Sequence, residues 1–372
     1  MTPVPLDLPI RTSEAADLAD LIFDVLGDKP IKDDLRLRLA GRGSTIEMET
    51  IKPCWGSIAA DPTHPTSYYI AIDGWRQDEC KHLLLHIAPA SAPSSSLFGK
   101  QLLIGRMRTP TKRDVVVNSV PFDVTERERV HTFATKVDKG FQPRPHGAAS
   151  AICAETADGE GAFEGFRSLL KLSNVNWASF CGDLTAIQWA AIRAGWREGF
   201  SAAPPRVVVD SPDNLDAVKD SLTAASAYSH FIVDATPLIS AGESKYDACL
   251  RVYAELHEHI RRAKMTSQAR TFDFEIALGA CTPEELTYCL EKLKAAGRPA
   301  QLVAVKATDP AAIAALALAA RPHGAALSYL ASGEEPVDRI TQIGRASMGR
   351  LNYHAPLANG GQVVSLAAAL RA

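Results

Sequence analysis

Residues 271–297 read TFDFEIALGACTPEELTYCLEKLKAAG, and this stretch carries the two signals that decide the fold. Its first part is a short apolar and aromatic run that predicts a buried strand. Its second part has Thr282 at an N-cap position, Pro283 at the first helical position, and Gly297 at the end. These signals predict a helix over Pro283–Ala296. The stretch therefore predicts one strand followed directly by one helix.

The same strand-helix rhythm repeats along most of the chain. Runs that predict strands are Asp114–Val120, Asn174–Phe180, Arg206–Asp210, His230–Asp234, Thr271–Ile276, Gln301–Lys306, Ala325–Leu330 and Arg350–His354. A helical pattern follows each of them, and the long gap over residues 140–172 leaves room for a further strand and helix. Eight such units over residues 111–372 predict a (β/α)8 barrel of TIM type. An open doubly wound sheet is the alternative, but no glycine-rich dinucleotide motif follows any strand.

Residues 1–110 follow a different pattern. A helical period covers Ser13–Val25, and strand-like runs separated by turn-rich segments come after it. Those runs are Leu35–Leu39, Thr45–Ile51, Tyr68–Ile72 and His82–Ile87. This alternation predicts a small α+β domain with an antiparallel sheet ahead of the barrel.

Composition narrows the class of protein. Of the 372 residues, 46% are apolar and 22% are charged, and the net charge is only -3. These values are typical of a globular protein and make nucleic acid or a charged membrane surface a poor partner. No apolar run approaches the roughly 20 residues of a membrane span. The seven cysteines are irregularly spaced without a CxxC pair, which predicts buried thiols in a reducing cytoplasm. The sequence leaves an oligomer open.

Barrel enzymes place catalytic groups at the carboxyl ends of their strands, so polar residues there are candidates. Glu275 is the strongest, because an unpaired carboxylate inside an apolar strand is costly. It either faces the barrel mouth or pairs with a basic residue. Asp210, Asp234, Lys306 and His354 end other predicted strands. The aspartates equally fit turn or helix caps, Lys306 fits a surface lysine, and His354 fits a structural histidine.

Other polar residues near the predicted strand ends are expected to bind substrate. They include Asn118, Asp183 and Tyr329. Arg144 lies in the proline-stiffened loop 142–147, where it is expected to hold a substrate carboxylate. The alternative for this loop is a purely rigid connection.

Several of these motifs together resemble the tagaturonate epimerase family. The resemblance lies in the acidic strand carrying Glu275, the Thr282-Pro283 helix start and the Leu-Lys-x-x-Gly helix end at Gly297. The order of a Gly-Asp pair at Asp183, then strands ending at Asp210 and Asp234, is also similar. The resemblance covers about residues 170–300 and implies a barrel enzyme that epimerises a sugar acid at a metal site.

The leading hypothesis is therefore a sugar or sugar-acid epimerase or isomerase that moves a proton next to a carbonyl. Its substrate is a small carbohydrate-like molecule. We expect Glu275 and Asp210 to transfer protons. The enediolate oxygen is stabilised by Lys306, or by a divalent metal, zinc or manganese, held by Asp234, Glu275 and His354.

Two alternatives remain open. Lys306 at an apolar strand end resembles the Schiff-base lysine of class I aldolases, so a metal-free aldolase is the second hypothesis. The third is a catalytically inactive barrel that acts as a binding protein. It is motivated by departures from the family pattern, such as Asp210-Ser-Pro-Asp213 where the family has Asp-His.

Overall fold

The computed structural model divides the chain into two compact units. The first unit consists of residues 1–142 together with 188–197, and the second of residues 143–187 and 198–372. The structure describes residues 10–27, 30–76, 79–93, 95–148, 151–155, 159–170, 178–240, 245–266, 270–307, 309–330, 337–347 and 351–356. The boundary thus falls later than the expected end of the first domain at residue 110.

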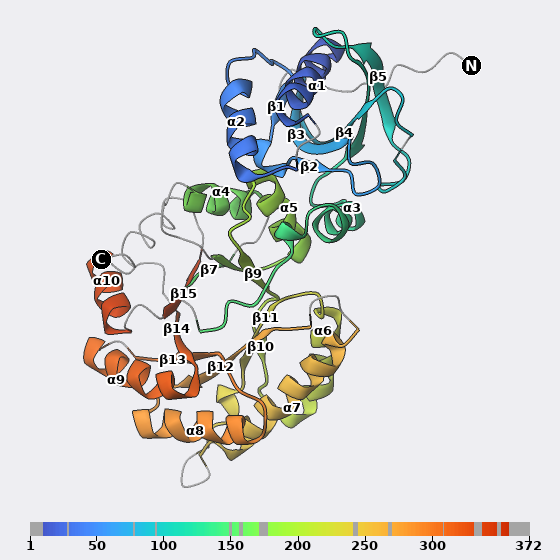
Figure 1. Cartoon of the computed structure of the whole chain (residues 1–372). Coiled ribbons are helices and arrows are strands. Elements are labelled where there is room, and N and C mark those ends of the chain that lie inside the picture. The colour runs from blue at the N-terminus through green and yellow to red at the C-terminus, as the bar shows by residue number, and fades with distance from the viewer. Residues whose placement is uncertain are drawn as a thin grey trace. The chain divides into compact units, whose positions relative to one another are not determined.

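The first unit is built on an antiparallel sheet with strand order β1-β3-β4-β6-β5, and β2 pairs with β3 (Figure 1). Its strands are β1 (Ile51–Pro53), β2 (Ala59–Ala60), β3 (Tyr68–Arg76), β4 (Glu79–Pro89), β5 (Leu102–Arg108) and β6 (Asp114–Pro121). Its helices and helical turns are α1 (Thr12–Leu26), α2 (Asp33–Gly43), η1 (Trp55–Ser57), α3 (Arg127–Thr132), η2 (Phe133–Val137) and η3 (Lys139–Phe141).

Two sequence predictions for this part of the chain are wrong. Residues 35–39 lie in helix α2, not in a strand, because the buried Leu35, Leu39 and Gly43 recur every four residues. The run Asp114–Val120 is a strand, but it pairs antiparallel with β4 and β5. Asn118 consequently lies inside the antiparallel sheet and does not end a strand of a barrel.

The two faces of this sheet have different environments. Tyr68, Ile70 and Ile72 of β3 share one buried apolar cluster with residues of helix α1 such as Leu18 and Ile22. Because side chains alternate along a strand, the intervening residues, including Asp73, lie on the other face. The sheet therefore has one apolar face and one face that carries polar groups.

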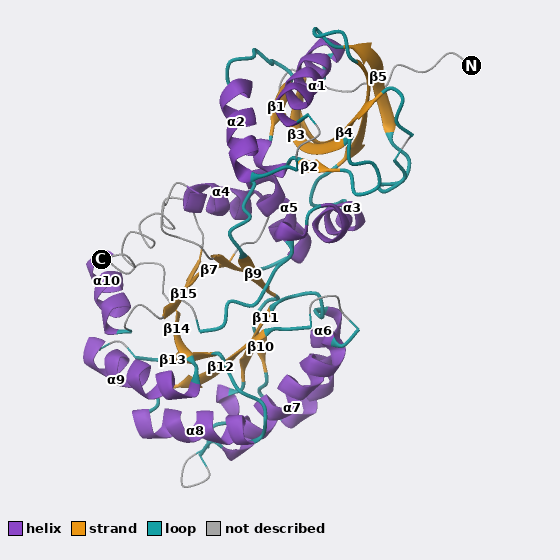
Figure 2. Cartoon of the chain, in the orientation of Figure 1, coloured by secondary structure: helices purple, strands orange, loops and turns teal. Residues whose placement is uncertain are grey.

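The second unit contains a parallel sheet of strand order β10-β11-β12-β13-β14-β15-β7-β8-β9. Its strands are β7 (Ala151–Glu155), β8 (Ala178–Cys181), β9 (Phe200–Ala203), β10 (Val207–Val208), β11 (His230–Asp234), β12 (Asp273–Gly279), β13 (Leu302–Val305), β14 (Ala326–Leu330) and β15 (Leu351–Pro356). Its helices and helical turns are α4 (Gly159–Leu170), the start of α5 (Leu184–Ala194), η4 (Pro212–Asn214), α6 (Leu215–Ala224), η5 (Thr236–Leu238), α7 (Asp247–Lys264), α8 (Pro283–Ala295), α9 (Pro310–Ala320), η6 (Arg321–His323) and α10 (Val337–Ala346). Figure 2 shows the helices outside the curved row of strands.

The expected alternation of strands and helices is confirmed in coarse outline as a mixed α/β architecture. The gap over 140–172 holds β7 and α4, and β9 is a strand that the sequence patterns missed. The run Arg206–Asp210 is reduced to the two-residue β10, which pairs in parallel with β11 as expected.

The row of strands curves until distant segments meet. The last described strand, β15, pairs in parallel with β7, the first strand of the unit. Between β9 and β11 no ladder is recorded among the described residues, but the Ser229 backbone N–H donates to the Ala202 carbonyl over 3.1 Å. The Ser229 carbonyl in turn accepts from the Asp273 N–H at 2.9 Å. Ser229 therefore links β9 to the start of β12.

Local capping signals hold where the sequence predicts them. Thr282 accepts a hydrogen bond from the Glu285 backbone N–H, and Glu285 bonds back to the Thr282 N–H, which completes a capping box. Asp309 caps α9 through the Ala312 N–H. Within the described part of the chain, no helix is both long enough and apolar enough to pass through a lipid bilayer.

Two glycines allow a close backbone crossing in the first unit. A Cβ added to Gly195 would lie 2.5 Å from the Gly56 Cα, and one added to Gly56 would lie 2.4 Å from the Gly195 Cα. Gly195 also has a φ of +71°, which side chains disfavour. Gly99 has the same φ of +71°, but nothing within 4 Å of an added Cβ.

This pair of glycines gives a matched stability test. Gly99→Ala pays only the left-handed backbone cost of about 1–2 kcal/mol. Gly195→Ala adds a steric clash, which typically costs about 1–3 kcal/mol more. We expect Gly195→Ala to unfold at a clearly lower temperature than Gly99→Ala in thermal denaturation. Equal melting temperatures for the two variants would contradict the close crossing.

Candidate active site

Strand β12 turns Glu275 away from the helices. The ring of Phe274 packs against Tyr253 and His257 of helix α7, with ring centroids 6.5 and 5.1 Å apart. Since neighbouring residues of a strand face opposite sides, Asp273 and Glu275 face the interior of the curved sheet. The inward orientation expected for Glu275 is therefore what the structure shows.

Strand β11 has the same alternation. The ammonium group of Lys264, from α7, lies over the ring of Phe231 at 5.7 Å, so Phe231 faces the helices. His230, Ile232 and Asp234 consequently face inward. The parallel register sets His230 beside Asp273 and Ile232 beside Glu275.

Glu275 and His230 form a fully buried pair. The Nε2 atom of His230 lies 3.0 Å from the Glu275 Oε2, and neither side chain is exposed. Burial lowers the pKa of His230, an effect that the hydrogen bond to Glu275 opposes. The Nδ1 atom of His230 is buried with no hydrogen-bond partner in the described part of the chain. A carboxylate and an imidazole that share a proton away from water are suited to proton transfer.

The loop before β7 covers the amino ends of these strands. The backbone N–H groups of His146 and Gly147 both donate to the Asp273 carboxylate, at 2.6 Å and 3.0 Å. The Nδ1 atom of His146 lies 3.2 Å from the same group, and its ring lies 5.7 Å from the ring of His230. The Arg144 N–H bonds to the carbonyl of Phe200 at the start of β9. This loop thus closes the amino-terminal end of the sheet.

Small side chains face inward on the carboxyl side of Glu275. Ala277 of β12 is in register with Ala304 of β13, which is in register with Ser328 of β14. The hydroxyl of Ser328 is buried and has no hydrogen-bond partner among the described residues. Ala203 of β9 is likewise fully buried. The described strands therefore fill little of the interior between Glu275 and their carboxyl ends.

Polar groups at the carboxyl ends make mainly local bonds. Asp234 accepts from the Thr236 N–H at 3.0 Å and the Thr236 hydroxyl at 2.6 Å, while Arg206 lies 3.9 Å away. Asp210 is exposed and accepts from Asn214 at 2.8 Å.

The expected site residues are only partly brought together. Asp234 lies one inward layer above Glu275, about 7 Å along the strand direction. Lys306 is exposed just beyond β13, and the exposed Asp183 caps α5 through the Ala186 N–H.

Three other candidates are placed elsewhere. Arg144 is exposed at the amino-terminal end, opposite to where a substrate-binding arginine was expected. Tyr329 is next to the inward-facing Ser328 and so lies on the opposite face of β14. His354 is paired with Cys153 in the backbone ladder, and its side chain lies outside the described residues.

The expected metal centre does not form from the described ligands. The Asp234 carboxylate is engaged by Thr236 and that of Glu275 by His230. In the second unit, as far as its side chains are described, no three His, Cys, Asp or Glu groups come close enough to share an ion. The metal remains a prediction of the sequence.

Sequence reasoning missed His230, Asp273 and Arg206 as parts of this site. A signal was present for the first two, because each begins an apolar strand in the same alternation as an inward acid. Their partners are distant in sequence: His230 and Glu275 are separated by 45 positions, and His146 and Asp273 by 127.

Comparisons with known proteins were made for the chain. No family model matches it, and no curated protein matches. Among solved structures, it is similar to a protein assigned as a tagatose 6-phosphate kinase from Sinorhizobium meliloti, with 12% identity and a TM-score of 0.43. That match covers 56% of this chain and 64% of the other, so it spans less than two thirds of that protein.

Two further solved structures are similar over much of their own length. One is assigned as a fructose-1,6-bisphosphate aldolase from Coccidioides immitis, with 15% identity, a TM-score of 0.37, and coverage of 60% of this chain and 87% of the other. The other is tryptophan synthase from M. tuberculosis, with 14% identity, a TM-score of 0.35, and coverage of 60% and 94%. The case for the site rests on the residues of this chain.

Buried histidines predict how stability changes with pH. Burial lowers the pKa of His257 to about 4, and it also lowers that of His230. The unfolded chain then binds more protons than the folded chain below the ordinary histidine pKa of about 6.5. We expect the free energy of unfolding to fall as the pH drops from about 6.5 to 4. Above that window these histidines contribute no slope.

His257→Phe isolates one part of this effect. Phenylalanine keeps a ring against Phe272 and Phe274, which lie 5.0 and 5.1 Å from the His257 ring, but it cannot be protonated. Urea unfolding at several pH values should show a shallower loss of stability in acid for the variant than for the wild type. The same pH dependence in both proteins would be evidence against a buried neutral His257.

Proposed function

We propose that the second unit is a (β/α)8 enzyme that epimerises or isomerises a sugar or sugar acid by moving a proton next to a carbonyl. The proposed ring closes where Ser229 links β9 to β12. The observation that carries the function is the inward, fully buried Glu275 bonded to His230 at 3.0 Å. Small side chains above this pair, with the unpartnered hydroxyl of Ser328, support entry of a polar substrate from the carboxyl ends.

Glu275 acts as the base in this scheme. Its carboxylate accepts the proton of the carbon next to the substrate carbonyl, and the C–H electron pair moves to form an enediolate. Returning the proton to the opposite face gives the epimer, and returning it to the neighbouring carbon gives the isomer. His230 is a positioning residue, because its Nε2 holds the Glu275 carboxylate in place.

Cationic groups at the carboxyl ends hold the substrate. Arg206 and Lys306 follow or flank inward-facing strand ends, and positive charge there offsets the negative charge that develops on the enediolate oxygen. Asp210 is solvent-exposed and bonded to Asn214, so the proton transfer is assigned to Glu275. Asp234 and Glu275 are not grouped as metal ligands, so these steps are assigned to side chains alone.

The central prediction concerns Glu275→Gln. Glutamine keeps the shape of the side chain and an acceptor for His230 but cannot take up a proton, so turnover should fall by about 10²–10⁴-fold. The measurement is incorporation of solvent deuterium, at the carbon next to the carbonyl, into a panel of ketoses, aldoses and hexuronates. Mass spectrometry of the recovered sugars reads the result.

The matched control is Glu291→Gln, which makes the same chemical change on the exposed side of helix α8. This variant should exchange deuterium at the wild-type rate. If Glu275→Gln is folded and as active as the wild type on a substrate that the wild type uses, the role given to Glu275 is wrong. If Glu275→Gln unfolds, the pair is structural, and His230→Asn then tests the positioning role through the pH profile of exchange.

The aldolase alternative makes a separate prediction. A Schiff-base lysine needs an ammonium group that loses its proton readily, which burial promotes, but Lys306 is exposed. Borohydride treatment in the presence of a small keto compound should therefore leave Lys306 unmodified in peptide mass analysis. A reduced adduct on Lys306 would favour the aldolase.

A further inference from the structure

Three potential metal ligands share one face of the sheet in the first unit. Asp73 of β3 is directly opposite His82 of β4 in the antiparallel ladder, so their side chains emerge on the same side. Cys80 is two residues before His82 and therefore faces that side as well. This is the face opposite the apolar cluster that contains Ile72 and Leu83.

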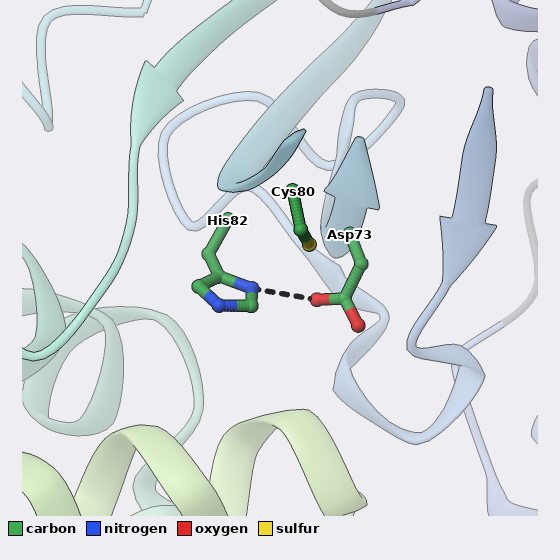
Figure 3. Close-up of side chains that lie close together, drawn as sticks. All are labelled: Asp73, Cys80 and His82. Carbon is green, nitrogen blue, oxygen red and sulfur yellow. Dashed lines mark hydrogen bonds and ion pairs between the residues drawn. The ribbon is translucent and has the colours of Figure 1, made fainter. Parts of the chain in front are cut away.

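The ligand atoms already lie close together. The His82 Nδ1 and the Asp73 Oδ1 are 2.8 Å apart, and all three ligand atoms, including the Cys80 sulfur, lie within 4.8 Å of one another. Figure 3 shows the imidazole, the thiol and the carboxylate gathered at the end of the two strands. Zinc bonds of about 2.0–2.3 Å place neighbouring ligand atoms about 3.3–3.7 Å apart. Small side-chain rotations would bring the three groups to that spacing.

The neighbouring side chains orient these ligands. Arg193 donates to the second carboxylate oxygen of Asp73 at 2.9 Å, which turns the Oδ1 atom toward His82. The ring of Trp189 packs edge-on against His82 at 4.9 Å, and the Arg193 guanidinium lies over Trp189 at 4.4 Å. Supporting bonds of this kind to ligating carboxylates and imidazoles are usual around protein-bound metals.

The chemistry of the three groups selects the metal. A thiolate favours zinc over magnesium or calcium, and imidazole and carboxylate are both ordinary zinc ligands. The negative charges of a bound thiolate and carboxylate balance the two charges of the ion. All three side chains are half-buried, so an ion has access and is partly shielded from water. A purely structural cluster would explain Asp73, His82 and Arg193, but it gives no role to the thiol.

We propose that Asp73, Cys80 and His82 form a zinc-binding site, with water in the fourth position. The site lies in the first unit and does not depend on the function proposed for the second. Zinc there replaces the His82–Asp73 hydrogen bond by three metal bonds that join β3 to β4. Binding to the folded state alone stabilises the first unit.

The test uses the full chain, stripped of metal with a chelator under reducing conditions and then titrated with Co²⁺. Cobalt in place of zinc gives a sulfur-to-cobalt absorption band only when a thiolate is a ligand. We expect this band to appear, to saturate at one ion per chain, and to disappear when Zn²⁺ is added. No band, or a band that Zn²⁺ does not displace, would overturn the proposal.

Variants identify the ligands. Cys80→Ser should abolish the band, and His82→Gln should weaken cobalt binding at least about 10-fold. Cys281→Ser removes another half-buried thiol, in the second unit, and should leave the band unchanged. A band that persists in Cys80→Ser would rule out this site.

Glu275→Gln separates the two proposals. It should retain the cobalt band while losing deuterium exchange, and Cys80→Ser should do the reverse. If Cys80→Ser does not fold, the cobalt band of the wild type and its loss in His82→Gln still decide the question.

Discussion

Strand β12 directs two carboxylates into the interior of the second unit, and much of that unit is arranged to satisfy them. A buried carboxylate without a partner is strongly destabilising, and removing one member of a buried charged pair typically costs about 3–5 kcal/mol. Asp273 is satisfied by two backbone N–H groups of the 143–148 loop. Glu275 is satisfied by His230 on the neighbouring strand. One strand thereby fixes both the loop under the sheet and the residue that must begin β11.

Local sequence signals predicted much of the second unit. The alternation around Phe274 and Glu275 requires only a strand with helices on one side, and the structure has both. The helix beginning at Thr282 is set by bonds within one turn, so its capping box could be predicted from a few residues. The inward orientation of Glu275 could be predicted for the same reason. Its partner could not, because nothing local relates residues 45 positions apart.

The failures also have physical causes. A β-branched run such as Asp114–Val120 predicts a strand, but sheet membership depends on distant partners, and these lie in β4 and β5. In Leu35–Leu39, alternating leucine and arginine fit a strand as well as a helix. The helix prevails because Leu35 and Leu39 then share one buried side, while Asp33 and Asp34 favour its amino end. At Asp234, the nearby Thr236 takes up the carboxylate, as a turn-capping aspartate would require.

The same alternation rule explains why the first unit has room for a separate chemistry. Once Ile72 and Leu83 are committed to the apolar cluster, their neighbours Asp73 and His82 must lie on the opposite face. That face is half-buried, so its carboxylate needs partners, and it has them in His82 and Arg193. The Cys80 thiol is the group that those ion pairs leave unexplained. Its position two residues from His82 follows from the strand alone, and a metal is the partner that uses all three groups together.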